Sequence, residues 1–246
     1  MIHYKTLLLY EELGLKRTEI HRGIKFKDSA WLKKYINLNT ELRTRGKNEF
    51  EKDFFKLMNN SVYGKTMENV RTRVDIRLVN SEEGARKLAV EPNFRHATVF
   101  DENLAAFHMK KTTVKLNKPV YLGMTILDLS KTLMYRFHYQ YMKNKYGEKS
   151  KMLYTDTDSL LYEIETEDFY KDINADIEEW FDTSAYSPNH PSGIKTGMNK
   201  RVVGKMKDEL GDKILTEFGG LRAKLYSFKI NDGEETKNVK VYPRQQ

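Results

Sequence analysis

Two carboxylates stand one residue apart in the segment Tyr154-Thr155-Asp156-Thr157-Asp158-Ser159. The runs on either side, residues 151–154 and 159–164, are short and rich in aromatic and aliphatic side chains, which predicts a β-hairpin with Asp-Thr-Asp at its tip. Side chains two apart in extended backbone point to the same side, so Asp156 and Asp158 are expected to converge. Two close carboxylates remain ionised when a cation lies between them, and hard oxygen ligands suit Mg²⁺.

Because Mg²⁺ normally shares its ligand shell with substrate phosphates, this spacing indicates a phosphate ester or anhydride as substrate. The alternative is an ordinary polar turn, since Asp favours turns through local hydrogen bonds. So short a pattern does not separate the two readings by itself.

A second group of polar residues follows helical spacing between Lys56 and Gly64. Lys56 and Asn60 are four residues apart, so they share one face of a helix, and Tyr63 and Gly64 continue that face. A lysine beside an amide can bind a triphosphate, and an aromatic ring next to a glycine can contact a sugar or base. The alternative is an amphipathic helix with a solvated lysine and a tyrosine packed in the core.

The elements that must position these residues can be read from the same sequence. Asn48 with Glu51 resembles a capping box, which predicts a helix from Asn48 that Gly64 ends or kinks. A second long helix is predicted over 129–146, followed directly by the Asp-Thr-Asp hairpin. Shorter elements are predicted as a strand at 74–79, helices at 82–88 and 168–181, a loop over 182–200, and strands at 201–206, 221–230 and 239–242, the last pairing across the turn at 231–233. Strands and helices without regular βαβ alternation predict an α+β fold with an antiparallel sheet.

Composition narrows the class of protein. The chain has 246 residues, no cysteine and a net charge of +8, so a thiol nucleophile and a cysteine-bound zinc site are excluded. Residues 154–190 hold one lysine against 11 acidic residues, while the remainder is basic. A basic body interrupted by an acidic stretch fits a polyanion partner and a metal site, although solvated lysines would give the same balance.

Without a long apolar run or a signal peptide we expect a soluble intracellular protein with no membrane partner; nucleus, cytoplasm and organelle are not distinguished.

Taken together, the motifs resemble those of the family B DNA polymerases, in particular the organellar, viral and mobile-element branch with its protein-primed and Polinton-type members. Lys56 to Gly64 is similar to the fingers motif Lys-x-x-x-Asn-Ser-x-Tyr-Gly, and Tyr154 to Ser159 to the palm motif Tyr-x-Asp-Thr-Asp-Ser. Lys224-Leu225-Tyr226 fits the family's Lys-x-Tyr motif. The three motifs occur in the family's order.

The resemblance implies a role for each matching residue. Asp156 and Asp158 would be catalytic carboxylates that hold Mg²⁺, with Mn²⁺ as an alternative, and Asp158 would be the more direct ligand. The residues that would contact the incoming nucleotide are Lys56, Asn60, Ser61, Tyr63 and Gly64. The residues that would contact the primer are Lys224, Tyr226 and Thr157. Arg43, Arg45 and Lys47 are further candidates for phosphate contacts, with ordinary solvent-facing residues as the alternative.

The chain departs from the family pattern in one respect. No segment resembles the motif Asp-x-x-Ser-Leu-Tyr-Pro, which carries another catalytic aspartate upstream of the fingers, and neither Asp28 nor Asp128 substitutes for it. We therefore expect an incomplete polymerase right hand without an exonuclease domain and with little or no thumb. Its expected parts are fingers and adjoining helices at 1–73, an insertion at 74–120, the palm at 121–230, and the start of a thumb or a terminal hairpin at 231–246.

The function implied is template-directed addition of deoxynucleotides to a primer 3′-hydroxyl by two-metal nucleotidyl transfer. The implied partners are primer-template DNA, deoxynucleoside triphosphates and a terminal protein primer. One alternative is an inactive mobile-element remnant that only binds nucleic acid. Another is a glycosyltransferase that uses Asp-x-Asp to hold Mn²⁺ and a nucleotide-sugar, which leaves the segments 56–64 and 224–226 unexplained.

Overall fold

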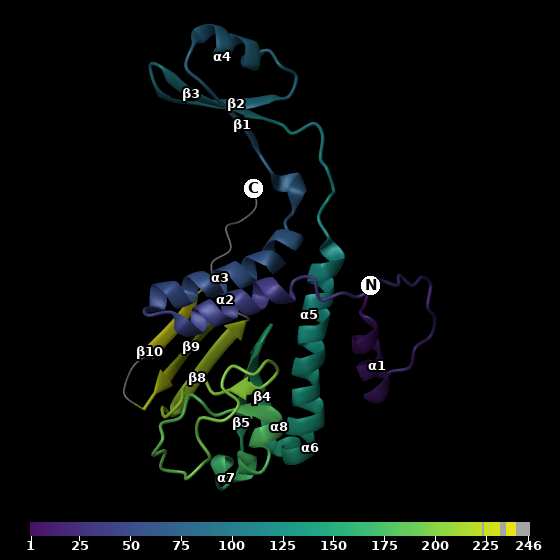
Figure 1. Cartoon of the computed structure of the whole chain (residues 1–246), viewed down its shortest axis with the longest axis vertical. Coiled ribbons are helices and arrows are strands. Elements are labelled where there is room, and N and C mark those ends of the chain that lie inside the picture. The colour runs from purple at the N-terminus through teal and green to yellow at the C-terminus, as the bar shows by residue number, and fades with distance from the viewer. Residues whose placement is uncertain (223, 232–234, 240–246) are drawn as a thin grey trace. The chain divides into compact units, whose positions relative to one another are not determined.

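A computed structural model describes residues 1–222, 224–231 and 235–239 (Figure 1). The chain forms two compact units, one made of residues 1–21 and 127–246 and the other of residues 22–126. The division falls within the long helix α5 (Val120–Tyr135). Each unit combines helices with small antiparallel sheets, so the α+β prediction is confirmed, whereas the arrangement into fingers, palm and thumb stays a prediction.

Two adjacent helices dominate the unit of residues 22–126: α2 (Lys33–Arg45) and α3 (Glu49–Thr66) (Figure 1). The predicted start of α3 is confirmed, because the Asn48 side chain accepts a hydrogen bond from the Glu51 backbone N–H at 2.8 Å. The Glu51 carboxylate accepts a hydrogen bond from the backbone N–H of Lys47, also at 2.8 Å. In a standard capping box it would accept from the N–H of the cap residue Asn48, one residue later. Gly64 does not end the helix, which continues to Thr66.

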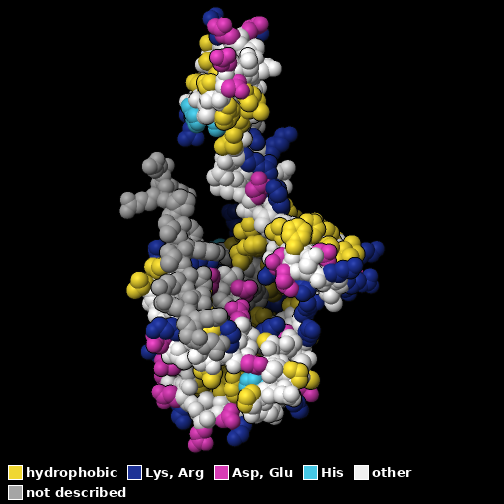
Figure 2. Space-filling model, turned by 90° about the vertical axis from the view of Figure 1, so that its left-hand side faces the viewer, with side chains coloured by type: hydrophobic (Ala, Val, Ile, Leu, Met, Phe, Trp, Pro, Cys, Tyr) yellow, Lys and Arg dark blue, Asp and Glu magenta, His cyan; other side chains and the backbone are white. Residues whose placement is uncertain are grey.

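A small sheet with one helix follows α3 after a short 3₁₀ helix (Val70–Thr72). Its elements are β1 (Asp75–Val79), α4 (Glu82–Ala89), β2 (Phe94–Asp101) and β3 (Leu104–Met109). The strands have the antiparallel order β1-β3-β2. The strand predicted at 74–79 and the helix predicted at 82–88 are confirmed as β1 and α4, whereas β2 and β3 were not predicted. Hydrophobic side chains reach the surface of this sheet (Figure 2), among them Leu78 and Val99.

In the other unit, helix α1 (Tyr4–Glu12) is joined to α5 by a buried polar network. The His3 backbone N–H donates to the Asp128 carboxylate at 2.6 Å, and the hydroxyls of Thr6 and Thr132 are 2.9 Å apart. The long predicted helix is present but begins at Val120 rather than at Leu129, because the apolar spacing continues back to the preceding Pro119. It continues through a π-helical segment, Arg136–Met142, and α6 (Lys143–Tyr146) to Gly147, whose φ of +55° ends it as expected.

The predicted Asp-Thr-Asp hairpin is formed by β4 (Ser150–Asp156) and β5 (Ser159–Ile164). After it, the predicted helix over 168–181 is wrong as a single element, since it divides into α7 (Phe169–Asn174) and α8 (Ile177–Trp180). Side chains from these helices, from the π-helical segment and from residues 181–194 after α8 form the core of the unit. Its buried members are Phe137, Tyr141, Met142, Ile173, Ile177, Phe181, Tyr186 and Ile194.

The predicted loop over 182–200 is confirmed except at its first residue, which ends the short strand β6 (Phe181–Asp182). The strand predicted at 201–206 is wrong, because Arg201 and Gly204 have φ values of +62° and +92°, which extended backbone does not have. Only β7 (Met206–Lys207) is a strand there, paired in parallel with β6.

The last sheet has the antiparallel order β10-β9-β8. The single strand predicted over 221–230 is wrong, because the chain reverses between β8 (Leu215–Arg222) and β9 (Leu225–Ile230), whose end residues pair directly. A strand does pair with β9 as predicted, but it is β10 (Glu235–Val239) rather than 239–242, and residues 240–242 lie outside the described part. In the described part of the chain, no helix has both the length and the apolar character needed to cross a bilayer.

Candidate active site

The Asp-Thr-Asp turn at the end of β4 has a strained backbone. Asp156 pairs with Ser159 as the last residues of the hairpin, so Thr157 and Asp158 form the turn. Thr157 has a φ of +52°, and the Asp158 N–H donates to the Asp156 carbonyl at 2.6 Å, which closes a three-residue γ-turn. Such backbone in a non-glycine residue is costly and concentrates at functional sites. The strand alternation that predicted convergence of the two carboxylates therefore stops at Asp156, and Asp158 is directed by the turn.

The carboxylate of Asp156 is ion-paired with Lys224, 68 residues away in the chain and in the same unit. The Lys224 ammonium nitrogen lies 2.9 Å from Oδ2 of Asp156, and the Thr157 hydroxyl donates to Oδ1 at 3.2 Å. The hydrogen bond from Lys224 is the main reason that the pKa of Asp156 lies below its usual range. Burial opposes this shift, while hydrogen bonds from Thr157 and Tyr154 make smaller contributions that lower the pKa further. Asp156 is therefore a carboxylate at neutral pH. Lys224 has a φ of +64°, so both sides of this contact have left-handed backbone near the interacting groups.

Aromatic rings pack beside this ion pair. The rings of Tyr154 and Tyr226 are 4.7 Å apart between centroids, and Phe218 of β8 lies 6.5 Å from Tyr154. Burial raises the pKa of Tyr154 to about 12, and the negative charge of Asp156 adds to the effect. Tyr154 thus keeps its phenolic proton at neutral pH.

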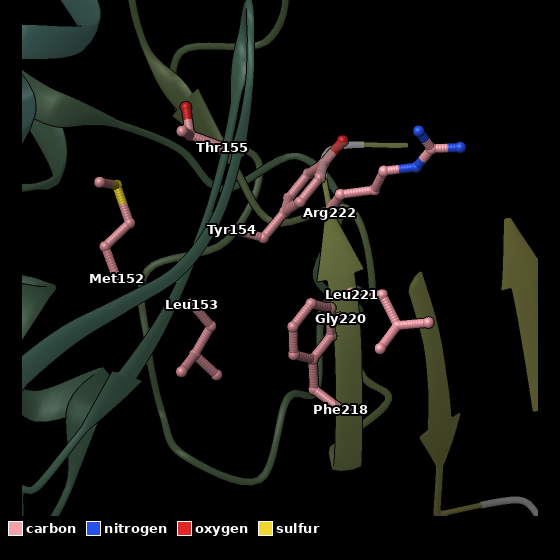
Figure 3. A pocket seen from close by; sticks show the side chains of 8 residues that line it. All are labelled: Met152, Leu153, Tyr154, Thr155, Phe218, Gly220, Leu221 and Arg222. Atoms are coloured by element: carbon pink, nitrogen blue, oxygen red, sulfur yellow. The ribbon is translucent and has the colours of Figure 1, made fainter. Parts of the chain in front are cut away.

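A hollow of about 370 Å³ opens between β4 and β8 next to these rings (Figure 3). Tyr154 and Phe218 project into the space between the strands, and the guanidinium of Arg222 extends past the end of β8 (Figure 3). The lining residues are Met152, Leu153, Tyr154, Thr155, Phe218, Gly220, Leu221 and Arg222. Sequence reasoning missed Phe218 and Arg222. The signal that could have found them is the pair Gly219-Gly220 inside a strand, which marks a place where something approaches the backbone closely.

Tertiary structure thus unites two of the three predicted motifs. Asp156 and Tyr154 come from the hairpin, whereas Lys224 and Tyr226 come from the turn and strand after β8. The third motif, Lys56 to Gly64, lies in the unit of residues 22–126.

On α3, one face of the predicted nucleotide motif is exposed and another contacts α2. Lys56, Asn60 and Gly64 are exposed at steps of four residues, as one helix face requires, while Tyr63 is half-buried. The Ser61 hydroxyl donates to the Met58 carbonyl at 2.8 Å, so it is engaged by its own helix. On the side toward α2, the Met58 carbonyl also accepts from the hydroxyl of Tyr35, at 3.3 Å.

Polar atoms without a hydrogen-bond partner lie buried on α2 and α3. Among the described residues these are Nδ2 of Asn39, Nε of Arg43 and Oδ1 of Asn59. An unsatisfied buried polar group costs about 1–3 kcal/mol. Of the three basic candidates for phosphate contact, Arg43 therefore has an unused buried donor, whereas Arg45 is paired with Glu41 on its own helix. Lys47 is exposed, and its backbone N–H donates to the Glu51 carboxylate in the cap of α3.

The carboxylates fit a divalent cation only in part. Asp156 and Asp158 offer the hard oxygens that Mg²⁺ prefers, but no group of three metal-ligating side chains occurs anywhere in the described ranges. An octahedral ion bound there would need its other ligands from water, phosphate or residues outside the described part. The arrangement also differs from a complete metal site because the Lys224 ammonium, rather than a metal ion, contacts the Asp156 carboxylate.

Comparison with known proteins identifies a family. The family model described as DNA polymerase type B, organellar and viral, matches residues 4–144. The matched range includes the whole of α3 and ends before the Asp-Thr-Asp hairpin. No curated protein and no solved structure matches the chain.

Proposed function

The chain belongs to the type B DNA polymerases of the organellar and viral kind, and from this premise we propose that it acts in template-directed addition of deoxynucleotides to the 3′-hydroxyl of a primer. The family match supports the class of reaction. The arrangement of this chain's own residues supports the location of the reaction, at the tip of the β4–β5 hairpin.

The observation that carries the proposal is the meeting of the Asp-Thr-Asp hairpin with the Lys-x-Tyr segment. An ion pair of 2.9 Å and a ring contact of 4.7 Å join two segments that the sequence separates by some 70 residues. A polar turn without function would not need an ammonium at its carboxylate, an aromatic wall beside it and strained backbone on both sides. A polymerase site needs anionic ligands for cations next to cationic groups for phosphates.

In this proposal Asp156 and Asp158 contribute oxygen ligands to a divalent cation, Mg²⁺ or Mn²⁺, which would neutralise phosphate charge when bound. Lys224 and Tyr226, with Thr157 in the turn, contact the primer end. Tyr154 keeps its proton and packs against the ring of Tyr226.

The incoming deoxynucleoside triphosphate would bind the exposed face of α3. Lys56 supplies a mobile positive charge for the triphosphate, and the Asn60 amide lies one turn further on the same face. Tyr63 offers a ring for the sugar and base, and a Cβ built at Gly64 meets no atom within 4 Å, so this part of the helix is open to close approach. Ser61 would act through its bond to the Met58 carbonyl, which fixes its hydroxyl. A terminal protein primer remains a proposed partner on the basis of family resemblance.

A second candidate function is nucleic-acid binding without catalysis. It is favoured by the ion-paired state of Asp156 and by the lack of a third metal-ligating side chain nearby among the described residues. The basic charge of the chain would then account for binding through phosphate contacts alone.

Primer extension separates the two candidates. The 246-residue chain is incubated with a labelled primer-template, deoxynucleoside triphosphates and Mg²⁺ or Mn²⁺, next to D156N, D158N and a matched variant, D101N, whose exposed carboxylate lies in β2. Because the described ligand set is incomplete, we expect slow extension that both hairpin substitutions abolish and D101N does not. DNA binding that weakens with salt, without any extension, would instead support the second candidate.

A further inference from the structure

The Lys224 ammonium lies beside the Asp156 carboxylate, where a metal ion bound to that carboxylate would also lie. We propose that Lys224 is an exchangeable counter-ion: it neutralises the Asp156 carboxylate until a divalent cation binds there, and the incoming cation releases it toward a phosphate of the nucleic-acid strand. This inference rests on the proposed function, because it assumes that Asp156 is a ligand of the divalent cation.

Both oxygens of the carboxylate are already engaged. Oδ2 accepts from Lys224 and Oδ1 accepts from the Thr157 hydroxyl, so a cation that ligates Asp156 directly shares an oxygen with a donor that is already in place. Mg²⁺ binds carboxylate oxygen at about 2.0–2.1 Å, and an ammonium held on the same carboxylate would then lie within a few ångströms of a double positive charge. The repulsion between the two cations makes departure of Lys224 the expected result even where the metal takes Oδ1.

The backbone around the contact allows such an exchange without rearrangement. Thr157 and Lys224 are held in left-handed conformations, which persist only where surrounding packing fixes them. The ring contact between Tyr154 and Tyr226 supplies that packing, next to each of the two groups. The ammonium itself is at the end of a flexible four-carbon stem, so rotation of one side chain suffices to move it.

The released ammonium would enter a region suited to phosphate. The Lys224 side chain is 31% exposed, and Arg222 extends from the adjacent end of β8 beside the hollow (Figure 3). Lysine binds phosphate as a point charge through three donors. The exchange thus couples two events that the proposed reaction needs together. A divalent cation binds the Asp156 carboxylate, and the Lys224 ammonium contacts a phosphate of the nucleic-acid strand.

Titration with Mn²⁺, followed by electron paramagnetic resonance of the free ion, tests the competition. Variants K224M and K224R are compared with K229M, a matched control because Lys229 is also paired at 2.9 Å, with Glu217, in the same sheet. We expect K224M to tighten Mn²⁺ binding by about three- to tenfold, as the loss of one competing charge in partly exposed surroundings predicts. K224R and K229M should bind as the wild type does, and K224M should give no gain in a D156N background.

Amine footprinting gives a second readout that does not depend on activity. The chain is acetylated at limiting reagent with and without Mg²⁺, and the modification of each lysine is measured by mass spectrometry. Exchange predicts that Mg²⁺ raises modification of Lys224 and leaves Lys229 unchanged. The inference is overturned if Mn²⁺ binding depends on Asp156 while K224M has no effect, and the proposed function then stands. If D156N leaves Mn²⁺ binding unaltered, the metal role of Asp156 fails and the exchange fails with it.

Discussion

Two glycines inside helices should respond in opposite directions to replacement by alanine. Gly123 lies in α5, where a Cβ would be 2.2 Å from the sulfur and 2.4 Å from Cγ of Met67, and 3.0 Å from the Thr66 hydroxyl oxygen. Gly64 lies in α3, where a Cβ would meet no atom within 4 Å. Alanine favours helix at both positions, so any difference between them reports the close approach at Gly123.

The size of the effect follows from these contacts. In a helix interior, alanine is more favourable than glycine by about 0.5–1 kcal/mol. Overpacking a tight contact costs about 1–3 kcal/mol. Met67 is 40% exposed and can swing partly into solvent, whereas Thr66 is buried and donates to the Tyr63 carbonyl at 2.7 Å, so it cannot retreat. We therefore expect G123A to lower the free energy of unfolding by about 0.5–2 kcal/mol and G64A to raise it by about 0.5–1 kcal/mol.

Urea denaturation monitored by circular dichroism measures both changes. The double variant M67A/G123A tests the cause, because removal of the Met67 side chain should relieve most of the penalty and give a coupling energy of about 1 kcal/mol. If G123A stabilises the protein as much as G64A does, the close approach is not a constraint in solution and the reasoning is refuted.

Three further predictions concern the core, an ion-pair cluster and the nucleotide site. I177A should cost about 2–5 kcal/mol of unfolding free energy in urea denaturation, because Ile177 is 1% exposed in the core cluster. Hydrogen bonds from Arg73 and then Lys118 hold the pKa of Glu68 well below its usual range. The ionised Glu68 carboxylate therefore contributes its full stabilisation of the fold above the unfolded-state pKa of about 4.3, and loses it as the pH falls below that value. The melting temperatures of wild type and E68Q should differ most above that pH and converge at lower pH. G64A should weaken binding of a fluorescent deoxynucleotide while it stabilises the fold; unchanged affinity would remove Gly64 from the proposed site.

Elements controlled by neighbouring residues were predictable. The Asn48 cap and the Asp-Thr-Asp hairpin depend on side chains and turn residues within a few positions of each other, and both occur where the sequence indicates. Two of the wrong strand predictions lie where the backbone is unusual. The strand expected over 201–206 is interrupted by left-handed residues, and the one expected over 221–230 reverses at Lys224, which also has left-handed backbone. Hydrophobic spacing does not report the sign of φ in non-glycine residues.

The sequence by itself determined which residues could do the chemistry, because carboxylate, lysine and tyrosine side chains at fixed spacing carry that information whatever the fold. It also indicated the family, and the family match agrees. Only the tertiary structure decided that Asp156 meets Lys224 and that Phe218 and Arg222 border the same hollow. These contacts join β4 to β8 and β9, and they depend on how separate strands pack and on where the chain reverses. The physical reason is that local spacing fixes the direction of a side chain along its own element, whereas the partner it finds is set by the packing of elements far apart in the chain.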